Sequence, residues 1–101
     1  MSILSNNTIH HGLTTITAYS HTGNKTSSGK RVYQGCVALS RDIRNKYRLR
    51  FGDKIHIQGL GIFTYDDWMP KQWHNRIDIF MNDRTQAKRF GKKRLQVKIE
   101  K

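Results

Sequence analysis

The sequence predicts a mainly β protein, in which six short strands form a closed barrel or a sandwich and one or two short helices complete the fold. Three observations support this class. Short apolar runs that alternate with polar residues recur along the chain, and this is the period of a half-buried strand. Glycine, asparagine and serine separate the runs and favour turns. A chain of 101 residues can also bury one hydrophobic core.

The domain organisation follows from the same patterns. Residues 1–12 are polar and mixed, so we expect a flexible N-terminal arm followed by a single domain over residues 13–101. Residues 21–30 are rich in glycine, asparagine and serine and predict a loop. The expected strands lie at residues 13–19, 32–39, 54–58, 62–65, 76–81 and 94–100.

One strand and the helices have the clearest local signals. Ile55 and Ile57 alternate with polar residues, which predicts a strand with one buried face. Asn82 or Asp83 can cap a short helix that ends at Gly91, with Ala87 and Phe90 facing inward. The basic stretch 40–50 has room for one or two further helical turns.

Charge and cysteine content narrow the classes of function. The formal net charge is +12, which implies a polyanionic partner such as nucleic acid, anionic lipid or an acidic wall polymer. The single cysteine, Cys36, excludes an internal disulfide and a multi-cysteine metal site, and its apolar neighbours predict that it is buried. No apolar run reaches the length of a membrane span.

The segment between residues 67 and 78 is the most informative part of the sequence. Asp78 lies between Ile77 and Ile79 on an expected strand, although aspartate is a poor strand former and is seldom buried without a partner. In the simple interpretation, both isoleucines face the interior and Asp78 faces solvent. In the alternative, apolar surroundings keep this carboxylate for chemistry. Composition leaves these two interpretations equally open, and Asp67 is the candidate companion.

Several motifs, in this order, resemble the three-aspartate (3D) domain family over residues 17–99. They are Thr17-Ala18-Tyr19, Thr26-Ser27-Ser28-Gly29, Val37-Ala38-Leu39-Ser40-Arg41-Asp42, Phe51-Gly52-Asp53-Lys54-Ile55, Gly59-Leu60-Gly61, the segment 67–78, and Ala87 with Phe90-Gly91. By this resemblance Asp78 takes the position of the catalytic acid, Asp67 that of its partner, and Asp42 that of the third acidic residue. Trp68 and Pro70 stand where the family has a small and a polar residue.

The resemblance implies a six-stranded double-psi β-barrel that acts on bacterial peptidoglycan, related to rare lipoprotein A and to lytic transglycosylases. In such an enzyme one acid protonates the leaving oxygen of the β-1,4 bond between N-acetylmuramic acid and N-acetylglucosamine. The same group then takes the proton of the muramic acid 6-hydroxyl, so a 1,6-anhydro ring forms and no water is consumed. Asp78 is expected to fill both roles, while Asp67 orients it and raises its pKa. No cofactor and no metal are expected.

Other side chains near the acids are expected to bind the glycan or balance its charge. These substrate-binding candidates are Trp68, Tyr65, Lys71, Arg76 and Thr26. For Trp73 we favour core packing over sugar stacking. His74 could bind substrate or form a catalytic pair, but a loop histidine with no second histidine at ligand spacing is expected to be solvated. His10 and His11 lie in the expected arm and are expected to take no part.

The expected partners are peptidoglycan strands and anionic wall polymers, which places the protein in the periplasm or at the cell envelope. The first 15 residues do not read as a secretory signal, so export would need a signal removed earlier or another route. Two alternatives stay open: a glycan-binding barrel without catalysis, and a small basic module that binds nucleic acid through arginine, lysine and aromatic side chains.

Overall fold

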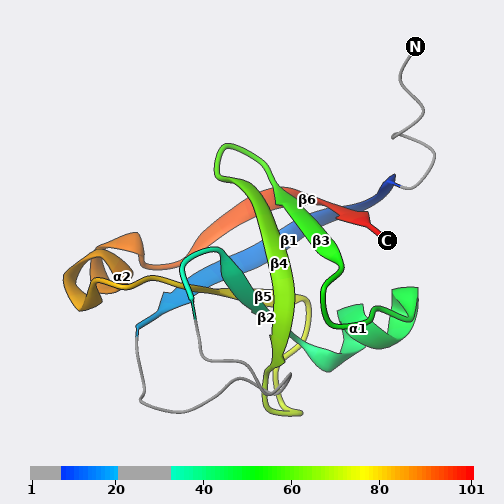
Figure 1. The fold of residues 1–101 in the computed structure, drawn as a ribbon, viewed down its shortest axis with the longest axis horizontal. Helices are drawn as coiled ribbons and strands as arrows, with labels where there is room; N and C mark the ends of the chain where they lie inside the picture. Colours follow the sequence, from blue (N-terminus) through cyan, green and yellow to red (C-terminus); the bar gives the residue numbers. More distant parts are fainter. Residues whose placement is uncertain (1–7, 21–32) are drawn as a thin grey trace.

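The structure is a computed structural model, and it describes residues 8–20 and 33–101. Six strands and two short helices follow one another along the chain (Figure 1). They are β1 (Thr8–Tyr19), β2 (Cys36–Leu39), α1 (Arg41–Tyr47), β3 (Lys54–Ile57), β4 (Gly61–Trp68), β5 (Arg76–Phe80), α2 (Arg84–Phe90) and β6 (Lys93–Glu100). The predicted class, a mainly β six-stranded barrel with one or two short helices, is confirmed.

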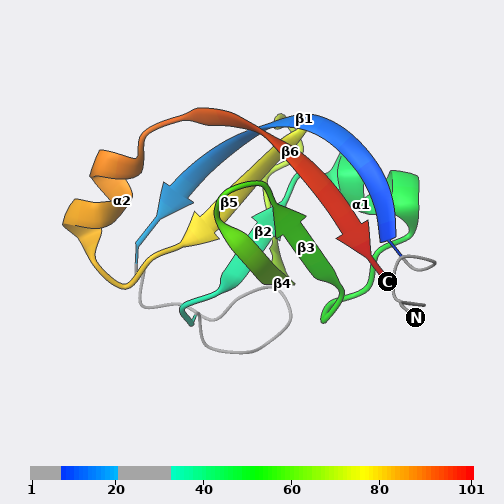
Figure 2. The same ribbon diagram turned by 90° about the horizontal axis from the view of Figure 1, so that it is seen from above.

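The strands close into a barrel in the order β1-β5-β2-β4-β3-β6, with β6 returning to β1. Two neighbouring pairs, β1–β5 and β2–β4, are parallel, and the other four pairs are antiparallel. Parallel neighbours need long connections, so each parallel pair joins strands that lie far apart in the sequence. Strands β1 and β6 run side by side and curve over the other strands (Figure 2).

The topology repeats itself after three strands. Exchanging β1, β2 and β3 with β4, β5 and β6 leaves the strand order and the direction of every pair unchanged. The helices obey the same rule, because α1 follows β2 and α2 follows β5. They lie at opposite ends of the barrel (Figures 1 and 2). This interlocked arrangement of two equivalent halves is that of a double-psi barrel.

Apolar side chains from all six strands fill the barrel interior. The buried core cluster consists of Ile16, Val37, Leu39, Ile43, Leu49, Ile55, Ile57, Tyr65, Ile77, Ile79, Val97 and Ile99. Alternate residues of each strand point inward, as in other small barrels that are packed rather than hollow. Cys36 is fully buried, as predicted.

The helix ends agree with the sequence signals. The Asp83 carboxylate accepts the backbone N–H groups of Thr85 and Gln86 and so caps α2. Gly91 ends the helix with a positive φ of 67°, a conformation that glycine adopts without strain. Ala87 is buried and Phe90 packs against the core, as expected.

Three element boundaries differ from the prediction. Strand β2 begins at Cys36 and not at residue 32, because residues 34 and 35 form a turn in which the backbone N–H of Cys36 donates to the carbonyl of Tyr33. Strand β1 begins at Thr8 and not at residue 13, because the polar residues 8–12 pair with β6 across a bulge near Gly12. They therefore belong to the barrel and not to a flexible arm; residues 1–7 lie outside the described part. Strand β4 extends through Trp68, so Asp67 and Trp68 lie on a strand and not in the predicted loop. No helix in the described ranges is long and apolar enough to cross a membrane.

Candidate active site on the outer face of the barrel

Four register partners form a row across four adjacent strands. Thr17 on β1 is opposite Asp78 on β5, which is opposite Ala38 on β2, which is opposite Asp67 on β4. Side chains of register partners point to the same side of a sheet. The row therefore places Asp78 and Asp67 on one surface, separated by the single methyl group of Ala38.

Asp78 faces outward yet remains half-buried. Its neighbours Ile77 and Ile79 are 0% and 1% exposed in the barrel interior, so the period of two turns Asp78 to the outer face. Both interpretations of the sequence are thus partly met: the carboxylate points away from the core, and its surroundings still limit its access to water.

The carboxylate of Asp78 is oriented by a short chain of hydrogen bonds. The Thr17 hydroxyl donates to Oδ1 of Asp78 at 3.0 Å. The same oxygen of Thr17 accepts Nε–H of Arg76 at 3.3 Å. Arg76 precedes Asp78 by two positions on β5, and strand periodicity puts both on the outer face. Thr17 therefore fixes the acid and connects it to a cation.

The pKa of Asp78 lies above its usual value. Burial is the main cause, because it disfavours the ionised form. The hydrogen bond from Thr17 and the positive charge of Arg76 act in the opposite direction, while the charge of Asp67 adds to the rise. The net result is a carboxyl group that holds its proton to higher pH than an exposed aspartate, which suits a general acid.

A β-bulge brings Asp67 to this face. The register between β2 and β4 passes from Val37–Tyr65 directly to Ala38–Asp67, so Asp66 is an extra residue on β4. Asp66 is fully buried and accepts a hydrogen bond from the Tyr33 hydroxyl. Burial, followed by this contact with Asp66, raises the pKa of Tyr33 to about 12. Without the bulge, Asp67 would point to the opposite side of the strand from the acid.

The aromatic and thiol groups beside the row were not expected in the site. Tyr19 lies two residues after Thr17 on β1, and its hydroxyl is 3.7 Å from Sγ of Cys36. Burial raises the pKa of Tyr19 well above its ordinary value, and Cys36, Asp67 and Asp78 contribute to the rise. Tyr19 therefore stays neutral and borders the acids as a hydrogen-bonding group. Only the pairing of β1 with β5 could have revealed Thr17 and Tyr19 as neighbours of Asp78.

Asp42, the expected third acid, serves a different purpose. It lies exposed in the first turn of α1, and its Oδ2 accepts the backbone N–H of Asn75 at 2.9 Å. Burial alone would raise its pKa, but hydrogen bonds from Ser40, Asn75 and Ile43 outweigh burial and the pKa is lowered. In the structure, Asp42 therefore connects α1 to the segment just before β5 through this hydrogen bond.

Both tryptophans are exposed and each contacts arginine. Trp68 is 44% exposed, with the guanidinium groups of Arg41 and Arg44 at 5.3 and 5.9 Å from its ring centroid. Trp73 is 38% exposed, so the expectation of core packing is wrong. The Arg76 guanidinium lies 4.1 Å from the centroid of Trp73, which is within the range of a cation–π contact. One of these arginine–tryptophan pairs reaches the row through the hydrogen bond of Arg76 to Thr17, and the other includes the residue that follows Asp67.

The remaining substrate-binding candidates have different outcomes. Tyr65 is 1% exposed and belongs to the core, so the expectation that its ring stacks on a sugar is wrong. Because of the bulge at Asp66, the side chain of Tyr65 points into the barrel while that of Asp67 points to the outer face. Lys71 is exposed in the turn between β4 and β5. Thr26 lies outside the described residues.

The expectation that His10 and His11 lie in an arm and take no part is wrong, because both lie on β1 and both rings are hydrogen-bonded. His10 bonds to Gln96, and His11 makes two such contacts. Its Nδ1 and Nε2 lie 2.6 and 2.8 Å from the Tyr47 hydroxyl and Oδ1 of Asn75. His11 thus joins β1 to α1 and to the segment before β5. His74 is exposed, as expected. In the described ranges, no group of three or more histidine, cysteine, aspartate or glutamate side chains is placed to hold a metal ion.

No known protein family matches the sequence, and no characterised protein matches it. The geometry itself defines the class of site: one half-buried carboxyl group with a raised pKa, oriented by a hydroxyl and accompanied by a second carboxylate in the same row on the outer face of the barrel. Such a pair can exchange a proton with a bound substrate.

Proposed function

We propose that this protein is a peptidoglycan-cleaving enzyme of the lytic transglycosylase type, with Asp78 as its general acid and base. The observation that supports this most is the position of Asp78, a half-buried carboxyl group with a raised pKa on the outer face of the barrel, in the same row as Asp67. The resemblance to the three-aspartate family agrees, because it assigns the acid and its partner to these same two residues. Action on peptidoglycan implies a location in the cell envelope.

In the proposed reaction, protonated Asp78 donates its proton to the glycosidic oxygen as the bond from that oxygen to C1 of the muramic acid breaks. The resulting carboxylate then accepts the proton of the 6-hydroxyl, whose oxygen forms the new bond to C1. The acid is regenerated, and the products are a free 4-hydroxyl and a 1,6-anhydro ring. One carboxyl group suffices, so no second carboxylate has to activate water, as ordinary glycosidases require.

Each neighbouring group has a defined part in this proposal. Thr17 orients the carboxyl group of Asp78 through their 3.0 Å hydrogen bond. Asp67 raises the pKa of Asp78 and so keeps it protonated at higher pH. Arg76, close to both Thr17 and Trp73, limits the rise and offers a cation and an aromatic face to the glycan. These are the features expected of a carbohydrate site with one acid.

The charge distribution supports an acidic polymer as the substrate. The net charge of +12 raises the local concentration of polyanions and accelerates their binding in a salt-dependent way. The carboxylates of peptidoglycan and the anionic polymers of the wall fit this requirement. Arg41 and Arg44 contact the ring of Trp68, the residue that follows Asp67 on β4, and carry part of this charge.

The test compares wild type with Asp78→Asn on purified insoluble peptidoglycan. Asparagine keeps an oxygen that can accept from Thr17 but cannot supply the proton, so the fold is preserved while lysis is expected to fall by about 10²–10⁴. Mass spectrometry of the soluble products should find fragments lighter by one water than hydrolysis would give. Asp83→Asn is the matched control, because asparagine also caps a helix and Asp83 lies at the start of α2.

Each other outcome points to a different function. Soluble products that have the mass expected from hydrolysis would indicate a glycosidase and not a lytic transglycosylase. Binding to peptidoglycan without lysis, equal in wild type and Asp78→Asn, would indicate a glycan-binding barrel. Tight, salt-sensitive binding to nucleic acid without affinity for the wall would indicate the nucleic-acid module.

A further inference from the structure

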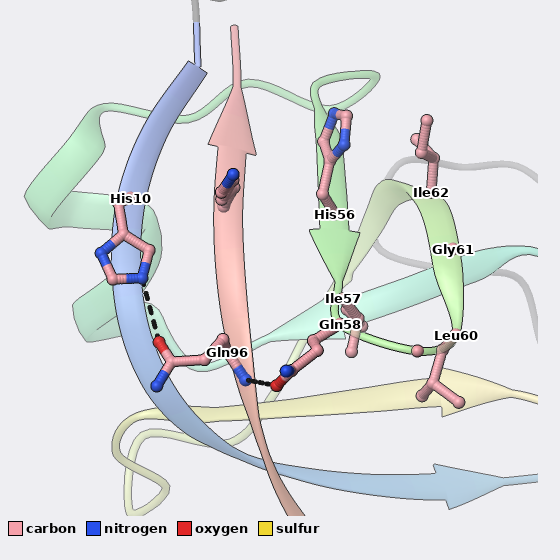
Figure 3. A pocket seen from close by; sticks show the side chains of 10 residues that line it. His10, His56, Ile57, Gln58, Leu60, Gly61, Ile62 and Gln96 are labelled. Carbon is pink, nitrogen blue, oxygen red and sulfur yellow. Dashed lines mark hydrogen bonds between the residues drawn. The ribbon is translucent and has the colours of Figure 1, made fainter.

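A cavity lies on a different part of the barrel wall from the row that contains Asp78. Its volume is about 660 Å³, within the range of about 300–1,000 Å³ typical of sites for small ligands. It is formed by β1, β6, β3 and the hairpin that connects β3 to β4 (Figure 3). The lining residues are His10, His56, Ile57, Gln58, Gly59, Leu60, Gly61, Ile62, Gln96 and Lys98.

The cavity is built on a second row of register partners. His10 on β1 is opposite Lys98 on β6, Lys98 is opposite His56 on β3, and His56 is opposite Ile62 on β4. Their side chains therefore share the outer face. A lysine stands between two imidazoles, and an isoleucine continues the row. This order places a positive charge at the centre and an apolar surface at one side.

The hydrogen bonds of the two imidazoles fix which nitrogen donates. Nε2 of His10 lies 2.9 Å from Oε1 of Gln96, and Nε2 of His56 lies 2.7 Å from Oε1 of Glu100. Both partners are acceptors, so each Nε2 donates. Within residues 8–20 and 33–101, no hydrogen bond or ion pair holds the Lys98 ammonium, whereas Glu100 is already bound to His56. The centre of the row is thus a cation ready to bind an anion.

Amide groups line the end of the cavity below the row. Oε1 of Gln58 accepts the backbone N–H of Gln96 at 3.2 Å, and the backbone N–H of Gln58 donates to the carbonyl of Gln96 at 2.9 Å. Figure 3 shows His10, Gln96 and Gln58 connected along this end. Among the described residues, the amide nitrogens of both glutamines have no partner, so they can donate to a ligand carbonyl. Such donors suit a peptide group better than a simple hydrocarbon.

The opposite side of the cavity is apolar and exposed. Leu60 and Ile62 are 39% and 62% exposed, and Figure 3 shows them on the β3–β4 hairpin, across from His10. Two exposed aliphatic side chains at the same rim form a surface that a small apolar group can cover. The glycines on either side of Leu60 leave this rim open, because they add no side chain.

We propose that this cavity binds the terminal carboxylate of a short peptide with small apolar side chains. The carboxylate pairs with Lys98, peptide carbonyls accept from Gln58 and Gln96, and the side chains lie against Leu60 and Ile62. Charge complementarity favours this occupant, since the lining contains a cation and two imidazoles and no acidic side chain. The barrel is closed, so the peptide is held by side chains and not by addition to a strand edge.

The experiment titrates the full chain, isotopically labelled, with N-acetyl-alanyl-alanine and with its C-terminal amide, followed by NMR. The carboxylate is expected to bind roughly tenfold more tightly than the amide, as for a charge-assisted hydrogen bond, and to shift the resonances of the β3–β4 hairpin. Lys98→Gln should abolish this preference, and Ile62→Ser should weaken both ligands equally. Lys88→Gln, on the exposed surface of α2, is the control and should leave binding unchanged.

Three results would overturn the proposal. The first is equal affinity for the acid and the amide, and the second is a preference that survives in Lys98→Gln although the variant folds like wild type. The third is tighter binding of hexanoate or inorganic phosphate than of the dipeptide, which would assign the cavity to another anion. None of these results depends on lysis, so the site can fail while the proposed reaction of Asp78 stands, and the reverse also holds.

Discussion

Replacing Asp67 with asparagine tests the electrostatic part of the proposed mechanism. Asp67 and Asp78 are separated by one strand, and neighbouring strands are about 4.8 Å apart, so the two backbones are about 10 Å from each other. Two unit charges at about 10 Å interact by about 0.4 kcal/mol in water and about 1.7 kcal/mol at an effective dielectric constant of about 20. Removing one charge lowers the pKa of the other group.

The expected effect on activity follows from these energies. At a pH above the pKa of Asp78, its protonated fraction should fall by a factor between about 2 and about 16, which are the Boltzmann factors of the two energies. Lysis near neutral pH should fall by the same factor, and the alkaline limb of the pH–rate profile should move to lower pH. The assay follows the turbidity of purified peptidoglycan over a series of pH values, with Asp83→Asn as the control.

A pH–rate profile for Asp67→Asn that does not move, or that moves to higher pH, would refute this reasoning. A uniform loss of activity with an unmoved limb would give Asp67 an orienting role alone. A loss far greater than about 16-fold at every pH would place Asp67 in direct contact with the substrate.

Four substitutions have expected effects on the stability of the fold. The unfolding free energy of the wild type should fall as the pH rises from about 4 through the raised pKa of Asp78, because the folded state binds that proton more tightly than the unfolded chain does. Urea unfolding at several pH values should show that Asp78→Asn lacks this pH dependence and is more stable than the wild type near neutral pH. Trp68→Ala should lower the unfolding free energy by about 1–2 kcal/mol, because it removes two cation–π contacts of about 0.5–1 kcal/mol each. An unchanged midpoint of urea unfolding would contradict this expectation. His11→Ala should lower the unfolding free energy by about 1–3 kcal/mol, because it removes the two hydrogen bonds of the imidazole. Tyr47→Phe removes one of them and should lower the unfolding free energy by about half as much, again measured by urea unfolding.

Local signals predicted the elements that depend on neighbouring residues. The strand Lys54–Ile57 follows from the alternation of Ile55 and Ile57, which the barrel interior uses directly. Helix α2 was predicted from its two ends, because the Asp83 cap and the positive φ of Gly91 are properties of single residues. In both cases the physical cause lies within a few positions of the sequence.

The site depends on pairings that local patterns do not contain. Thr17 and Asp78 are 61 residues apart, and only the parallel register of β1 with β5 makes them partners. A strict period of two on β4 would put Tyr65 and Asp67 on one face, but the extra residue Asp66 reverses this relation. The aromatic ring expected to bind sugar therefore lies in the core, while the expected acid reaches the surface.

The start of β1 was missed for a related reason. Residues 8–12 include two histidines and a glycine and show no apolar alternation, so nothing nearby favours a strand. Their partners are at the far end of the chain, in β6. His11 lies at the bulge near Gly12 and contacts the hydroxyl of Tyr47. A flexible arm, as expected from the sequence, would not make this contact.

The exchange symmetry of the barrel has a consequence for how the chain folds. Each strand that begins a half is hydrogen-bonded only to strands of the other half: β1 lies between β5 and β6, and β4 lies between β2 and β3. The first three strands therefore contain no complete sheet of their own, and a nascent chain cannot seal its wall until residues 93–100 have left the ribosome. Because nearly all pairing is non-local, folding is expected to be slow and all-or-none, on a scale of milliseconds to seconds. Fragments cut between the halves should stay unfolded separately and regain structure only when mixed.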